Sequence, residues 1–223
     1  MPELPEVEIT KQGLLPLINQ TVKSVAIRNS AMRWPIPMHL PETLANQKLL
    51  TLSRRAKYIQ LGFENGTLLV HLGMSGSISL LDRNYPPEKH DHFDILFQGG
   101  QIMRLNDPRR FGAVLWAGLN PASHPLLLNL GPEPLEESFD GPYLHRQLQS
   151  RKAAIKTSIM DAHLVVGVGN IYANEALFRS GIHPQIIANQ LSLAKCKKLA
   201  CEIKATLCDA LEAGEAACVI LLL

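Results

Sequence analysis

The sequence lacks a strong excess of charge of either sign. Its 22 lysine and arginine residues are nearly balanced by 20 aspartate and glutamate residues, which leaves a net charge of +2. This balance excludes a polybasic protein that binds nucleic acid through its overall charge, so such contacts require a local cationic surface. Basic residues do gather locally, at positions 54–57, 109–110 and 151–156. Each cluster taken alone is typical of a solvated face.

Long apolar runs are also missing. No charged segment followed by a short apolar stretch occurs at the start, and no apolar span is long enough to cross a bilayer. We therefore expect a soluble, intracellular protein with no membrane partner. A chain of 223 residues suggests one or two domains with a sizeable core.

Cysteine pairs of the type that bind zinc are absent. The sequence contains four cysteines, all late in the chain: Cys196, Cys201, Cys208 and Cys218. None belongs to a Cys-x-x-Cys pair, so the sequence predicts no zinc site. One of them shares helical spacing with a set of leucine and isoleucine residues: Cys196, Leu199, Ile203, Leu207 and Leu211. This spacing predicts buried or half-buried thiols on a helix.

The first half of the chain has the pattern of a β protein. A helix is expected at the start, where apolar residues fall near helical spacing: Leu4, Val7, Leu14, Leu15 and Ile18. Short apolar or alternating runs follow, bounded by turn residues, around positions 25–27, 59–63, 68–74, 93–97, 102–105 and 113–116. Several short strands separated by turns predict a sandwich or a barrel.

The second half has the pattern of a helical domain. Residues 121–142 are rich in proline and predict a linker between a first domain, 2–120, and a second, 143–223. Helical patterns then cover 143–150, 153–161, 170–180 and 192–212, with Asp140 as a start signal and Gly181 with Pro184 as a stop. The expected fold class is therefore α+β.

The amino terminus carries a reactive possibility. The run Pro2-Glu3-Leu4-Pro5-Glu6 follows Met1, and methionine is normally removed when proline comes next. The exposed secondary amine, with a pKa of about 7.7–8, can attack a sugar aldehyde carbon and form an iminium that accepts electrons. The simpler alternative is that both prolines merely begin a helix, which proline favours. Taken alone, the run favours this alternative.

Further motifs occur in a fixed order along the chain: Arg54-Arg55-Ala56-Lys57-Tyr58, His71-Leu72-Gly73-Met74-Ser75-Gly76, Lys89-His90-Asp91-His92, Asp107-Pro108-Arg109-Arg110-Phe111-Gly112 and Val166-Gly167-Val168-Gly169-Asn170-Ile171-Tyr172. With the amino-terminal run, this ordered set resembles the formamidopyrimidine-DNA glycosylase family, and more closely the bacterial enzyme for oxidised purines than endonuclease VIII. The resemblance extends from Pro2 to about Ala213. It implies an N-terminal helix, an antiparallel β-sandwich, and then a helical domain with a helix–two-turn–helix motif.

The resemblance implies three catalytic residues. Pro2 would attack C1′ of the damaged nucleotide, and Glu3 would be the adjacent acid–base group. Lys57 would contact the phosphate of the target nucleotide and donate a proton. Alternation also places Lys57 on the face of Ile59 and Leu61, where a lysine either extends to solvent or lies in a functional cleft. For Glu3 the structural alternative is a carboxylate that favours a helix N-terminus.

The resemblance also implies four DNA-binding residues around the extruded nucleotide. His71 and Asn170 would contact phosphates, and His90 and Arg151 match further DNA-binding positions of the family. Asn170 follows glycines that permit close approach, and the next helix offers N–H groups to an anion. Judged singly, His90 is explained as a surface histidine and Arg151 as part of a solvated helix face.

Three more residues would fill the space that base extrusion leaves. Met74 and Phe111 are apolar wedges for unstacked DNA, and Arg109 would face the orphaned cytosine. The competing interpretation places Met74 and Phe111 in the core and makes Asp107-Pro108 an ordinary turn.

The end of the chain departs from the family pattern. The family continues into a loop that covers the lesion and a four-cysteine zinc finger, which we find missing here. The apolar ending Cys218-Val219-Ile220-Leu221-Leu222-Leu223 looks like a truncated or out-of-frame terminus. We therefore expect no cofactor in this chain and reduced DNA affinity, because phosphate contacts dominate that affinity.

The resemblance implies base-excision repair by a bifunctional glycosylase and abasic-site lyase that acts on oxidised purines. Damaged double-stranded DNA is the expected partner, and we expect a monomer in the bacterial cytoplasm, at the nucleoid through its substrate. The alternative is a weakly active or inactive DNA-binding remnant of the family. A small-molecule enzyme with an N-terminal proline base is disfavoured, because it explains neither Arg109 nor Met74 nor the glycines before Asn170.

Overall fold

The computed structural model describes residues 1–221, with side-chain detail for residues 1–214. The chain divides into two compact units, one of Met1–Pro2 with Glu6–Leu128 and the other of Glu3–Pro5 with Asn129–Leu223. The division after Leu128 falls inside the stretch 121–142 that we predict to be a linker. The short segment Glu3–Pro5 belongs to the second unit although it lies at the opposite end of the sequence.

The N-terminal helix α1 (Leu4–Gly13) contributes to both hydrophobic cores. Leu4 is fully buried in the core of the second unit, whereas Val7 is buried in the core of the first. The helix ends at Gly13, and the short 3-10 helix η1 (Leu15–Leu17) follows with a proline near its start. The predicted helix therefore stops one turn earlier than its apolar spacing suggests.

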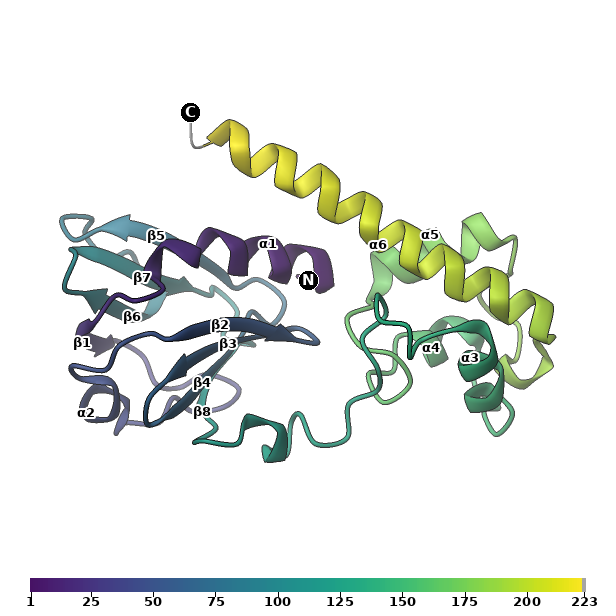
Figure 1. The fold of residues 1–223 in the computed structure, drawn as a ribbon, viewed down its shortest axis with the longest axis horizontal. Helices are drawn as coiled ribbons and strands as arrows, with labels where there is room; N and C mark the ends of the chain where they lie inside the picture. Colours follow the sequence, from purple (N-terminus) through teal and green to yellow (C-terminus); the bar gives the residue numbers. More distant parts are fainter. Residues whose placement is uncertain (222–223) are drawn as a thin grey trace. The chain divides into compact units, whose positions relative to one another are not determined.

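In the described part of the chain, the strands of the first unit form two four-stranded antiparallel sheets (Figure 1). One sheet has the order β1-β6-β7-β5, from Val22–Ile27, Asp91–Phe97, Gln101–Asn106 and Ser77–Asp82. The other has the order β2-β3-β4-β8, from Thr51–Arg55, Tyr58–Phe63, Gly66–His71 and Ala113–Trp116. The predicted strands are confirmed, whereas β2, β5 and the short helix α2 (Leu40–Leu44) have no counterpart in our prediction. A 3-10 turn, η2 (Pro121–Ser123), follows the last strand.

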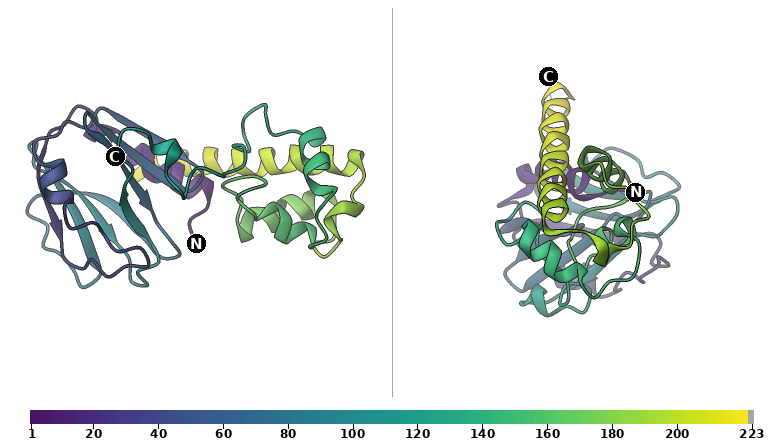
Figure 2. Two further views of the ribbon diagram at one scale, coloured as in Figure 1. Left: turned by 90° about the horizontal axis from the view of Figure 1, so that it is seen from below. Right: turned by 90° about the vertical axis from the view of Figure 1, so that its right-hand side faces the viewer.

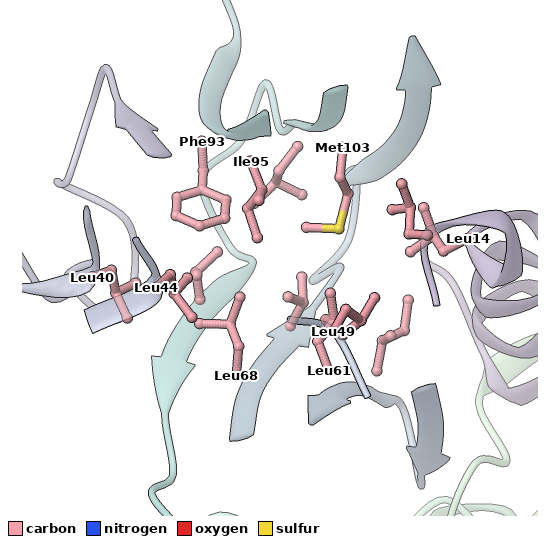
Figure 3. Close-up of a cluster of buried hydrophobic side chains, with 14 of the residues drawn as sticks. Leu14, Leu40, Leu44, Leu49, Leu61, Leu68, Phe93, Ile95 and Met103 are labelled. Carbon is pink, nitrogen blue, oxygen red and sulfur yellow. The ribbon is translucent and has the colours of Figure 1, made fainter. Parts of the chain in front are cut away.

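The core of the first unit lies between the two sheets. Phe93, Ile95 and Met103 from one sheet point toward Leu61 and Leu68 from the other (Figure 3). In β3, alternate residues from Ile59 to Phe63 are buried, as the period of a strand requires. The apolar alternation predicted for 68–74 ends early, because β4 stops at His71 and Gly73 turns the chain with a φ of 62°.

The second unit is helical, and its long helix α6 is drawn in yellow in both views of Figure 2. Its elements are α3 (Gly141–Leu148), α4 (Ile155–Ile159), α5 (Asn170–Ser180), η3 (Ala188–Gln190) and α6 (Leu193–Leu221). Asp140 begins α3 as predicted, since its carboxylate accepts the N–H of Tyr143 at 2.6 Å. Gly181 ends α5 as predicted, in the left-handed conformation with a φ of 68°.

The cysteines of α6 lie on different faces of that helix. Cys196 is fully buried, as predicted, and burial raises the pKa of its thiol to about 11. Cys201 and Cys208 are exposed, which corrects the prediction that these thiols are at least half-buried. They lie off the buried stripe because they follow Cys196 by five and by twelve residues, which turn an α-helix by about 140° and about 120° beyond whole turns. The expectations for Cys218 and for the apolar ending fall outside the described side chains.

Within the described residues, no helix is long and apolar enough to cross a membrane.

The cap of α3 gives a test of the helical unit. We expect Asp140→Ala to lower the free energy of unfolding by about 1 kcal/mol, because it removes the acceptor of the Tyr143 N–H. Asp140→Asn is the matched control, since an asparagine oxygen serves the same N-cap and should cost little. Urea denaturation followed by circular dichroism measures both variants. Equal stability of Asp140→Ala and the parent protein would contradict this role for the cap.

Candidate active site

Glu3 is buried and its carboxylate lies at the N-terminus of α5. Oε2 accepts the N–H of Gly169 at 2.7 Å, and Oε1 accepts the N–H of Ile171 at 2.9 Å. The N–H of Tyr172 lies 3.4 Å from Oε2. The first N–H groups of a helix have no partner within the helix and carry partial positive charge, so a carboxylate is stabilised there. The helix that Glu3 caps is α5, not the helix α1 that follows it in sequence.

Two glycines make room for this segment. A Cβ on Gly169 would lie 2.4 Å from Cδ of Glu3, and one on Gly167 would lie 2.6 Å from Cδ1 of Leu4. Gly167 also has a φ of 82°, in the left-handed region that favours glycine. The N–H of Leu4 donates to its carbonyl at 3.0 Å. The sequence predicted that these glycines permit a close approach, and in the structure the amino-terminal segment is what approaches them.

Pro2 precedes the anchored Glu3 directly. It is half-buried, and Met1 before it is 51 % exposed. The peptide bond between Pro2 and Glu3 is planar and short. The fixed carboxylate of Glu3 therefore restricts where the nitrogen of Pro2 can lie.

Lys57 lies in a turn and not on the strand that its spacing predicts. Arg55 pairs with Tyr58 across the β2–β3 hairpin, which leaves Ala56 and Lys57 as the two-residue loop. Ala56 has a φ of 54°. Its carbonyl accepts the Nη1 of Arg54 at 2.8 Å, and the Nε of Arg54 donates to Glu8 at 2.9 Å. These two bonds fix the turn that carries Lys57 against α1.

His71 ends β4 in a position that keeps its ring neutral. Burial, and then the positive charges of Lys57 and Arg33, lower the pKa of His71 to about 4, although Asp107 acts in the opposite direction. Nδ1 accepts the N–H of Gly73 at 3.0 Å. In the neutral ring the proton is therefore on Nε2, which can donate to an anion without carrying charge.

Arg33 is a cation that the sequence analysis missed. It is exposed, and its backbone N–H donates to the carbonyl of Arg110 at 2.8 Å. Its charge acts on both His71 and Tyr58, whose rings are 4.8 Å apart across the β3–β4 pair. The first unit thus places the cations Lys57 and Arg33 near the neutral ring of His71, and these two cations form a local cationic surface. No motif or spacing in the sequence singles out Arg33.

The three residues expected to fill the void occupy two adjacent loops of the first unit. Met74 is 42 % exposed and Phe111 is 39 % exposed, so neither belongs to the core, which removes the competing interpretation for both. The guanidinium of Arg109 lies 4.8 Å from the centre of the Phe111 ring. A Cβ on Gly73 would lie 2.4 Å from the backbone of Phe111, so the loops are in direct contact.

The structure places His90 beside the Arg109 loop and Arg151 in a loop of the second unit. The carbonyl of His90 accepts the N–H of Asp107 at 2.9 Å, which attaches it to the Arg109 loop. Arg151 follows α3 in a loop, not on the helix face weighed for it, and its Nη1 donates to Asp161 at 2.7 Å. Asn170, in contrast, is exposed as the first residue of α5, beside the capped N-terminus.

A metal site is not formed by the residues that the structure describes. None of their histidine, cysteine, aspartate and glutamate side chains form a group of three or more that could bind a metal ion.

The buried ring of His71 predicts an unusual titration. We expect NMR spectra to show its imidazole titrating near pH 4 in the folded protein, against about 6.5 in the urea-unfolded chain. The unfolded state then binds the proton first, so the free energy of unfolding decreases as the pH falls from about 6.5 to about 4. A folded-state titration near 6.5 would show that the ring is not desolvated.

Two family models match this chain. The formamidopyrimidine-DNA glycosylase N-terminal domain matches residues 1–114, and the H2TH domain of the same family matches residues 130–220, past Ala213 where we expected the resemblance to stop. The formamidopyrimidine-DNA glycosylase of Methylobacillus flagellatus is 59 % identical over 214 residues, which covers 96 % of this chain and 77 % of that protein. The Shewanella denitrificans protein is 51 % identical over 215 residues, covering 96 % and 79 %.

Solved structures of the same family have a similar fold. Lactococcus lactis formamidopyrimidine-DNA glycosylase, non-covalently bound to DNA containing an AP site, has a TM-score of 0.88 at 32 % identity and covers 95 % of this chain and 82 % of that one. The MutM (Fpg) protein of Thermus thermophilus has a TM-score of 0.84 at 35 % identity, with coverage of 96 % and 77 %. With family models that together match most of its length, this chain belongs to the formamidopyrimidine-DNA glycosylase family of DNA-repair enzymes.

Proposed function

We propose that this protein acts as a monomer in base-excision repair, where it removes oxidised purines from double-stranded DNA and then cleaves the abasic site. 8-Oxoguanine and formamidopyrimidines are the expected bases. The observation that carries the proposal is the buried Glu3 carboxylate, held by backbone N–H groups of α5 directly after Pro2. A nucleophile and an acid–base group are thereby adjacent, and one of them is fixed.

The reaction begins when the nitrogen of Pro2 attacks C1′ of the damaged nucleotide. The bond between C1′ and the base breaks, and the base leaves with a proton that Lys57 donates. The Glu3 carboxylate accepts the proton that the nitrogen of Pro2 loses and transfers it to the sugar ring oxygen as the ring opens, which leaves an iminium between Pro2 and C1′. Loss of a C2′ proton then expels the 3′ phosphate, and a second elimination expels the 5′ phosphate. The iminium accepts the electron pair, so these steps need no metal or organic cofactor.

The cationic surface of the first unit suits the DNA backbone. Lys57 would contact the phosphate of the target nucleotide, and His71 would donate from Nε2 to a neighbouring phosphate. Because the His71 ring is neutral, that contact would be a hydrogen bond and not an ion pair. We propose that Asn170 contacts a phosphate from the second unit, with His90 and Arg151 as further DNA-binding residues.

The exposed loops of the first unit suit the extrusion of a nucleotide. Met74 and Phe111 would enter the stack as apolar wedges, and Arg109 would donate hydrogen bonds to the orphaned cytosine. Stacking on Phe111 limits the conformations of Arg109 before DNA binds.

Borohydride reduction of an iminium tests the role of Pro2. We expect the mature protein to form a covalent adduct with duplex DNA that contains an abasic site. Pro2→Gly should reduce the adduct by about tenfold or more, because the ring that directs the amine is lost. Pro125→Gly, at an exposed position in the same unit, is the matched control and should form the adduct normally. If the parent protein forms no adduct at low salt, the proposed enzyme activity is wrong.

Separating base removal from trapping tests the role of Lys57. General acids contribute about 10²–10⁴ in rate, so Lys57→Ala should reduce removal of 8-oxoguanine by about 100-fold. Trapping at an abasic site that is already formed should change much less, since no base has to leave. Lys23→Ala, at an exposed position of β1, should affect neither assay. Equal losses in both assays for Lys57→Ala would contradict its role in base removal.

A further inference from the structure

Asp107 is a buried carboxylate that the proposed reaction does not use. It is 0 % exposed and follows the last residue of β7. Its Oδ2 accepts the N–H of Gly112 at 2.8 Å, and its Oδ1 accepts the hydroxyl of Ser75 at 2.7 Å. The N–H of Arg109 lies 3.3 Å from the same Oδ1. A buried carboxylate requires several such donors, and here they come from two different loops.

The backbone of Asp107 is fixed as firmly as its side chain. Its N–H donates to the carbonyl of His90 at 2.9 Å, and its own carbonyl lies 2.9 Å from Nε2 of the buried His92. Both partners are at the start of β6 or directly before it. The carboxylate of Asp107 is therefore held in place beside β6, and the Ser75 loop and the Arg109 loop both bind to it.

Ser75 joins the two loops to each other. Its hydroxyl donates to Asp107, and its Oγ also accepts the N–H of Arg109 at 3.2 Å. Ser75 follows Met74 directly, so this one hydroxyl ties the residue next to the Met74 wedge to the backbone of Arg109. On the other side of Met74, Gly73 contacts the backbone of Phe111, so the two loops also meet there.

We propose that Ser75 and Asp107 are positioning residues. They hold Met74, Arg109 and Phe111 in one rigid arrangement that recognises the base opposite the lesion. Neither residue reaches the reacting atoms. Arg109 can distinguish cytosine from adenine only if its guanidinium meets the base edge in a fixed geometry, and the Ser75 bridge holds the backbone from which that guanidinium extends before DNA binds. This inference rests on the proposed function.

The test compares excision of 8-oxoguanine opposite cytosine with excision opposite adenine. Ser75→Ala removes the bridge but leaves the buried acceptor with its two backbone donors, so the protein should fold. We expect the ratio of kcat/KM between the two duplexes to fall by about threefold or more, since the Arg109 N–H loses its bond to Ser75 and keeps only the contact with Asp107 at 3.3 Å. Ser75→Thr retains the hydroxyl and should retain the ratio. Asp107→Asn, which keeps one acceptor oxygen, should lower the ratio as Ser75→Ala does.

Borohydride trapping on single-stranded abasic DNA, which has no opposite base, separates the possible failures. Ser75→Ala should trap there within about twofold of the parent protein, because Pro2 and Glu3 are unchanged. An unchanged cytosine-to-adenine ratio in Ser75→Ala and in Asp107→Asn, with normal trapping by the parent protein, would overturn the positioning role. A loss of trapping in Ser75→Ala equal to its loss of excision would also overturn it, as a general structural defect. Absence of trapping by the parent protein on duplex abasic DNA would instead contradict the proposed function itself.

Discussion

The capping of α5 by the Glu3 carboxylate is the interaction on which the rest of the account depends. Hydrogen bonds from backbone N–H groups to an ionised carboxylate are short and strong, and those to Gly169 and Ile171 are 2.7 and 2.9 Å long. Breaking them would leave a buried carboxylate and helix N–H groups without partners, which is costly. The amino-terminal segment is therefore fixed at its third residue, and Pro2 is one peptide bond away. The chain terminus thereby becomes a defined position for the amine that we propose to attack C1′.

The Glu3 cap also constrains which residues can stand directly before α5. Gly167 and Gly169 have no space for a side chain, since Leu4 and Glu3 occupy it. The glycines before Asn170 therefore have a structural reason within the folded chain, before any DNA is considered. In the first unit, burial and the nearby cations keep His71 neutral and leave its Nε2 as a donor. His71 thus presents a donor that suits a phosphate, set by contacts within the first unit.

The sequence predicted elements better than it predicted contacts. The helix α5 was predicted with its correct bounds, because Asn170 follows a glycine loop and Gly181 ends the helix. The strand residues around Ile59 and Phe93 were predicted because their period and turn residues are local features. Lys57 was misplaced, since apolar alternation does not reveal that Arg55 and Tyr58 pair across a two-residue loop. Cys201 and Cys208 are exposed because the angular period of α6 places them off its buried stripe. Our prediction assigned all the thiols to that stripe together.

The periodicity and motifs of the sequence do not predict contacts between residues that are far apart in the chain. Glu3 and Gly169 are 166 positions apart, and nothing in their spacing predicts a bond. Arg33 lies outside every motif, and its position beside His71 depends on how the chain returns to the Arg110 loop. Ser75 and Asp107 lie within the motifs that carry the family resemblance, yet their bond appears only when the two loops fold together.

Peptide mapping by mass spectrometry of the borohydride-reduced protein–DNA adduct identifies the attacking nitrogen most directly. We expect a chain that lacks Met1 and carries the deoxyribose remnant on the nitrogen of Pro2. An adduct on Lys57 or another lysine, or a chain that reacts while it retains Met1, would contradict this expectation.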